Sequence, residues 1–90
     1  MTAQGSRNRL EAELVAWLNL RLAPPGVHIT RDTALFEGGL INSIRILELI
    51  AWTERAIARR IEDVDIQMNN FRTPARIADV FGTGDDHAGA

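Results

Sequence analysis

Apolar residues recur at three- and four-residue spacing along much of this 90-residue chain. That period places apolar side chains on one face of a helix, whereas a half-buried strand requires a period of two. The clearest case is the set Leu10, Leu14, Trp17, Leu18 and Leu22. Pro24-Pro25-Gly26 follows and predicts the end of this first helix. We find no alternating pattern typical of a strand, so the sequence predicts an all-α fold.

A second helix is predicted to begin near Ser43. Its stripe, mostly apolar, consists of Ile44, Leu47, Ile50, Ala51, Glu54 and Ile57. Ile46, Leu49 and Ile61 widen the stripe, and most of the charged residues fall elsewhere. This distribution is typical of an amphipathic helix that packs one face on a core.

Two shorter helices complete the predicted fold. Asp63 or Asp65 would cap a short third helix that runs to about Asn69. Thr73 is a favoured N-cap, and Pro74 suits the first position of a fourth helix. We therefore expect a small four-helix bundle with one short helix. Among its core residues we expect Leu14, Leu18, Phe71, Ile77, Val80 and Phe81.

The length allows a single domain. Residues 1–6 and 83–90 are small and polar, so we expect two disordered ends and a folded domain at 7–82. The absence of cysteine and lysine excludes disulfides, thiolate sites and Schiff bases. Residues 1–8 lack the apolar run of a signal peptide, and no stretch approaches about 20 apolar residues. We expect a cytoplasmic, soluble protein without a membrane partner.

A long connection, Val27–Asn42, leads to Ser43 and contains Gly38-Gly39. Long loops in small domains are often functional. A helix N-terminus carries partial positive charge, which would favour a phosphate ester on a serine placed there. Around this serine, a modifying enzyme would grip an apolar collar formed by Leu40, Ile41 and Ile44. The alternative is that Ser43 or Asn42 only caps the helix, because both residue types are favoured caps.

Four short motifs occur in order from residue 35 to residue 73: Leu35-Phe36-Glu37-Gly38-Gly39-Leu40, Asn42-Ser43-Ile44, Glu48-Leu49 and Asn70-Phe71-Arg72-Thr73. With this order and spacing the chain resembles the acyl and peptidyl carrier proteins, and within them the stand-alone aminoacyl and peptidyl carriers. The motifs cover about half of the chain, and the order of the helices extends the resemblance over nearly all of it.

The resemblance implies a carrier function rather than an enzyme. It implies 4'-phosphopantetheine attached covalently to Ser43, with Asn42 beside it, and cargo held as a thioester on that arm. It also implies three kinds of partner: a phosphopantetheinyl transferase, an adenylating ligase or acyltransferase that loads the cargo, and a downstream synthase. Nonribosomal peptide or polyketide biosynthesis, such as antibiotic biosynthesis, is the expected setting. The cargo stays open among amino acid, β-amino acid, acyl and peptide groups.

Two departures from the family pattern concern the partners. The family usually has aspartate before the serine, whereas Asn42 is uncharged. Between residues 43 and 60 the chain is net positive, whereas carriers of fatty-acid synthesis have an acidic helix there. Charge complementarity sets encounter rate and partner choice, so we expect dedicated partners. The expected partner surface adds four residues on the second helix to the collar: Arg45, Glu48, Trp52 and Arg55.

Two other functions are considered beside the carrier. The first alternative is a helical protein-interaction module without a prosthetic group. The second, a small DNA-binding domain, is disfavoured by the net charge of −2, so no nucleic-acid partner is expected. No histidine or carboxylate is spaced to activate Ser43 for hydrolysis. His28 has no partner at metal-ligand spacing and His87 lies in the polar tail, so no metal is expected. We expect a monomer.

Overall fold

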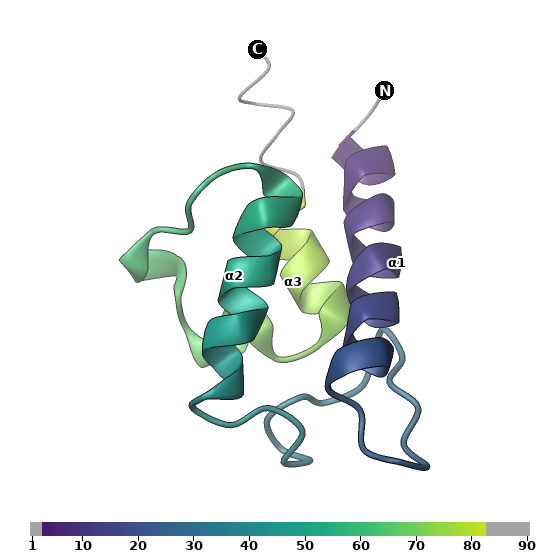
Figure 1. Cartoon of the computed structure of the whole chain (residues 1–90). Coiled ribbons are helices and arrows are strands. Elements are labelled where there is room, and N and C mark those ends of the chain that lie inside the picture. Colours follow the sequence, from purple (N-terminus) through teal and green to yellow (C-terminus); the bar gives the residue numbers. More distant parts are fainter. Residues whose placement is uncertain (1–2, 83–90) are drawn as a thin grey trace.

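A computed structural model describes residues 3–82, and within that range the protein is all-helical with no strand. Three α-helices lie side by side, with α1 and α3 in the closest contact (Figure 1). The all-α class predicted from the sequence is confirmed. No helix in this range is long and apolar enough to cross a membrane.

The first helix, α1, extends over Ala3–Arg21 and buries the expected face. Its four buried leucines are Leu10, Leu14, Leu18 and Leu22. The amides of residues 22 and 23 both donate to the Leu18 carbonyl at 2.9 Å, which closes the last turn before Pro24. The proline cannot continue the ladder, so the helix ends where the sequence predicted.

The start of α1 corrects the expected disordered end, because residues 3–6 belong to the helix. Gly82, at the end of the last helix, packs against this part of α1. A Cβ atom added to Gly82 would lie 2.9 Å from the Cα of Arg7, so the two backbones approach closely. This contact supports helical structure before Leu10, where the apolar pattern begins. Residues 1–2 and the expected tail at 83–90 lie outside the described residues.

Arg7 joins α1 to the last helix. Its guanidinium donates to the Asp79 carboxylate at 2.6 Å, to the Glu11 carboxylate and to the Ala75 carbonyl at 3.2 Å. Burial alone would lower the pKa of Arg7, but its hydrogen bonds to the Asp79 and Glu11 carboxylates, together with their negative charges, outweigh burial and raise the pKa. Arg7 therefore keeps its positive charge. The Glu11 carboxylate also accepts a hydrogen bond from the guanidinium of Arg31, in the long loop, at 2.9 Å.

The second helix, α2, extends over Arg45–Ile57, and its core face differs from the stripe that we expected. Leu49, Thr53 and Ile57 are buried, with Ile46 and Ile50 packed against the core beside them. In contrast, two members of the expected stripe are exposed, namely Ile44 at 73% and Leu47 at 65%. The helix carries apolar residues on two faces, and periodicity alone does not decide which one meets the core.

The last helix, α3, extends over Pro74–Phe81 as predicted. The Thr73 hydroxyl accepts a hydrogen bond from the Arg76 amide at 3.0 Å, and Pro74 occupies the first turn. Ile77 and Phe81 are buried in the core. The predicted core residues Leu14, Leu18, Phe71 and Ile77 are all at most 1% exposed.

The expected short third helix is absent from residues 3–82. Two 3-10 turns replace it, η1 at Asp63–Asp65 and η2 at Met68–Phe71, and neither has a side-chain cap. The apolar residues here, Val64, Ile66 and Met68, are two positions apart, so they cannot share one helix face. The described chain therefore has three α-helices, and the expected bundle of four is not observed.

The long loop between α1 and α2 is ordered by a few hydrogen bonds to buried positions. The Asn19 side chain donates to the Ile29 carbonyl at 2.8 Å and accepts from the Ile29 amide at 2.8 Å. Further on, the Leu35 amide donates to the Arg72 carbonyl at 2.9 Å. These bonds hold Ile29 and Leu35 in the core, where both are fully buried. The loop thus holds residues 40–43 in a fixed position before α2.

Ala58 ends α2 in a left-handed conformation, with φ of 60°. Alanine is disfavoured there because its Cβ crowds the backbone, whereas glycine adopts this conformation freely. We expect Ala58→Gly to stabilise the protein by about 0.5–1 kcal/mol, measured by urea denaturation. The exposed Ala56→Gly inside α2 is the matched control and should lower stability instead. A loss of stability in Ala58→Gly would contradict the expectation.

Candidate functional site

Ser43 lies in the turn that leads into α2, and Asn42 caps that turn. The Asn42 Oδ1 atom accepts from the Ile44 amide at 3.0 Å and from the Arg45 amide at 2.9 Å. Its backbone carbonyl accepts from the Ile46 amide at 2.9 Å. The sequence left open whether Ser43 or Asn42 is the cap, and the structure assigns the role to Asn42.

The Ser43 side chain is exposed, and no residue in the described part of the chain forms a hydrogen bond with its hydroxyl. The hydroxyl is therefore accessible to another molecule. It also forms no hydrogen bond with a base in residues 3–82, an arrangement that the serine nucleophile of a hydrolase requires.

The glycine-containing loop fixes the approach to Ser43. The Gly39 amide donates to the Phe36 carbonyl at 3.0 Å, and Gly39 has φ of +78°, which favours glycine over other residues. The Ile41 amide then donates to the Leu35 carbonyl at 2.9 Å. This turn buries Leu35 and Ile41 and directs the chain outward at residues 42 and 43.

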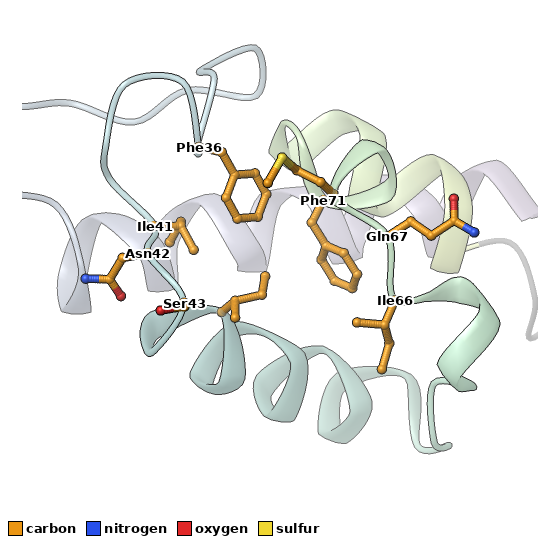
Figure 2. Close-up of a pocket in the computed structure, with 9 residues that line it drawn as sticks. Phe36, Ile41, Asn42, Ser43, Ile66, Gln67 and Phe71 are labelled. Atoms are coloured by element: carbon orange, nitrogen blue, oxygen red, sulfur yellow. The ribbon is translucent and has the colours of Figure 1, made fainter.

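An apolar groove of about 450 Å³, which no pattern in the sequence predicted, opens beside Ser43. In Figure 2 the rings of Phe36 and Phe71 lie between Ser43 on one side and Ile66 on the other. The groove is lined by Phe71, by three residues from the segment after α2 and by five from the loop and α2: Ile66, Gln67, Met68, Phe36, Ile41, Asn42, Ser43 and Ile46. None of these residues carries a charge.

Only some of the residues expected to contact partners are exposed. Ile44, Arg45, Glu48 and Arg55 are exposed beside or along α2. Ile41 is 3% exposed and belongs to the core, so it offers no surface to grip, and Leu40 is half-buried. Both had been assigned to the collar because they are apolar and precede Ser43, which does not determine their exposure.

Trp52 is half-buried and stacks on Trp17, with ring centroids 5.5 Å apart and an interplanar angle of 22°. Stacking across the contact between α1 and α2 accounts for both rings as packing residues. Trp17 therefore packs against the core, as its place in the apolar pattern of the first helix indicated. We expected Trp52 to contact partners, but only part of its side chain is accessible to them.

Among residues 3–82, no three histidine, aspartate or glutamate side chains are grouped so that they could hold a metal ion. His28 is exposed in the loop. Neither protein-family models nor curated proteins match the chain, so its functional interpretation depends on the residues around Ser43.

Proposed function

We propose that the protein is a carrier that holds an aminoacyl, peptidyl or acyl group on a 4'-phosphopantetheine arm at Ser43. The observation that carries this proposal is the exposed, unbonded hydroxyl of Ser43 in the Asn42-Ser43-Ile44 turn at the start of α2. On this proposal the fold is a variant of the four-helix carrier fold. The turns η1 and η2 take the place of the short third helix.

The residues around Ser43 fit a phosphate ester. The positive end of the α2 dipole and the exposed Arg45 guanidinium would both favour a negative group at this position. The amides of Ile44 and Arg45 would not bind the phosphate, because Asn42 already occupies them. When bound, the arm supplies a thiol for a thioester, which this chain without cysteine does not contain.

Modification of wild-type protein tests the proposal. Incubation with coenzyme A and a phosphopantetheinyl transferase should form a bond between the Ser43 oxygen and the pantetheine phosphate, with release of adenosine 3',5'-bisphosphate. Intact mass spectrometry should show one added phosphopantetheine, and peptide mapping should locate it at residue 43. Failure of several transferases to modify folded protein would contradict the proposal.

The exposed apolar residues on α2 favour the second candidate, a helical interaction module. Ile44 and Leu47 lie one turn apart on the outward face, where large apolar side chains are typical of protein interfaces. A carrier also requires such a surface, so these residues fit both functions. Addition of phosphopantetheine separates the two candidates, because a simple interaction module would not be a substrate.

The Asn42→Asp variant should be modified faster by a broad-specificity transferase, because carriers of this kind usually present aspartate there. Asparagine and aspartate cap helices comparably, and a carboxylate near the positive end of α2 should add about 0.3–1 kcal/mol of stability. Initial rates of mass gain and a urea denaturation curve measure the two effects. Asn42→Ala, which loses the cap, is the destabilised control. An equal or slower rate in Asn42→Asp would show that the missing charge does not slow the modification of the wild type.

The double variant Arg45→Glu/Arg55→Glu should lose about tenfold in kcat/KM at low salt with the transferase that modifies the wild type best. Both arginines are exposed and make no ion pair among residues 3–82, so the fold should persist. The loss should shrink at high salt, because charges at an interface act mainly on association. Arg59→Glu/Arg60→Glu makes the same charge change beyond α2 and is the control. Equal rates in the two double variants would exclude a specific role for Arg45 and Arg55.

A further inference from the structure

The permanently charged basic residues of this chain are all of one kind. The sequence contains ten arginines, and lysine, cysteine and tyrosine are absent from it. The amine of lysine and the thiolate of cysteine are side-chain nucleophiles that attack carbonyl carbon readily. An arginine guanidinium stays protonated and delocalised, so it supplies positive charge without acting as a nucleophile. The chain therefore carries cations that do not accept an acyl group.

Contacts within the folded chain explain arginine at only three of the ten positions. Arg7 donates to two carboxylates and one backbone carbonyl, a set that suits the forked guanidinium. Arg31 and Arg72 each bind one carboxylate. The other seven arginines are exposed, and their side chains form no hydrogen bond or ion pair among residues 3–82. Lysine would supply the same charge at those seven positions.

Recognition by a partner explains only part of this pattern. Arg45 and Arg55 belong to the expected partner surface on α2. Arg9 lies on α1 and Arg76 on α3, outside that surface, and both are exposed. A property that holds over the whole surface accounts for all of these positions, and low nucleophilicity is such a property.

Arg45 shows what a lysine would do near the proposed attachment site. It is the first residue of α2, two positions after Ser43, and its side chain is exposed. A group on a flexible arm at Ser43 meets side chains of this first turn at high effective concentration. A lysine amine there would attack the thioester carbonyl, form an amide and expel the thiol of the arm, which takes up the proton that the amine releases. The cargo would then be held as a stable amide, out of reach of a partner enzyme.

We propose that the arginine-only surface makes the protein inert to the thioester that it carries. This inference rests on the proposed carrier function, and it adds a cargo class, namely thioesters reactive enough to acylate a neighbouring amine. Among the candidate cargoes, the α-aminoacyl group fits this class best, because its ammonium group draws electrons from the carbonyl carbon. A simple acyl thioester is less electrophilic and has less need of such a surface.

Glycyl arms attached to Ser43 test the proposal. Glycyl-coenzyme A and a transferase load wild type, Arg45→Lys and Arg9→Lys to completion, and intact mass confirms each product. After incubation at mildly alkaline pH, hydroxylamine cleaves thioesters and leaves amides, so the retained glycyl mass measures transfer to an amine. Hydrolysis, to which the exposed His28 can contribute, leaves no acyl group on the protein.

The Arg45→Lys variant should retain about tenfold more glycyl group than Arg9→Lys, because effective concentration falls with distance from the arm. Arg9 lines a hollow with Ala56, at the far end of α2 from Arg45. The wild type should retain only the background that the amino terminus of the chain contributes in all variants. Arg45→Gln removes the same charge without adding an amine, and it should behave like the wild type.

Equal retention in Arg45→Lys and the wild type would overturn the proposal. Acetyl arms, attached in the same way from acetyl-coenzyme A, should be transferred to residue 45 of Arg45→Lys more slowly than glycyl arms. Equal rates for the two groups would overturn the assignment of aminoacyl cargo. Failure of both coenzyme A derivatives to add mass to the wild type would instead count against the carrier function.

Discussion

The Ser43→Ala variant should accept no phosphopantetheine under conditions that modify the wild type completely. The proposed attachment replaces the hydroxyl hydrogen of Ser43, and alanine has no oxygen to substitute. The fold should not change, because the Ser43 side chain is exposed and forms no hydrogen bond with the residues that the structure describes. Asn42, not Ser43, supplies the cap of α2, so the turn persists in the variant.

The sequence provides its own control for this result. The chain has two serines, and the other one, Ser6, is half-buried in α1. The Ser6→Ala variant should be modified like the wild type. Intact mass spectrometry on both variants, with circular dichroism as a check on folding, measures the outcome. Modification of Ser43→Ala would disprove the assignment of Ser43 as the attachment site. Loss of modification in Ser6→Ala alone would instead identify Ser6 as that site.

Elements with one apolar face were predicted well from the sequence. In α1 the leucines follow a single stripe, and the stop at Pro24 is a local effect of backbone chemistry. In α3 the cap at Thr73 and the proline after it are also local signals. The glycine-containing approach to Ser43 was found for the same reason, because Gly39 adopts a conformation that other residues disfavour.

Elements whose structure depends on distant contacts were predicted less well. Apolar residues lie on two sides of α2, and the packing of the whole core decides which side is covered, so Ile44 was assigned to a core stripe although it is exposed. Ile41 was assigned to the surface although the turn at Leu35 buries it. The pair Asn42-Ser43 offers two favoured caps in succession, and only the geometry of the turn selects one.

The groove illustrates the same limit. Phe36, Ile46 and Phe71 come from three separate segments, and no spacing in the sequence predicts that they enclose a common space. Val64, Ile66 and Met68 alternate with polar residues, and this alternation, which we did not recognise in the sequence, was the available signal against the expected short helix. In the non-helical segment Ile66 and Met68 line the groove, whereas Val64 does not.

The Phe71→Ala variant should lose about 3–5 kcal/mol of stability, which is a large part of the total for so small a domain. Phe71 is 1% exposed, and its ring lies 5.2 Å from the ring of Phe81 at an interplanar angle of 35°. Removing the ring deletes apolar contacts and leaves a cavity that the neighbouring helices cannot fill completely. Because Arg72 also anchors the loop through Leu35, relaxation around residue 71 is restricted.

Urea denaturation followed by circular dichroism measures this loss, with Phe71→Leu as a milder variant that keeps most of the volume. Val64→Ala, at an exposed position between α2 and α3, should change stability by less than about 0.5 kcal/mol. An unchanged denaturation midpoint in Phe71→Ala would mean that the ring lies outside the core.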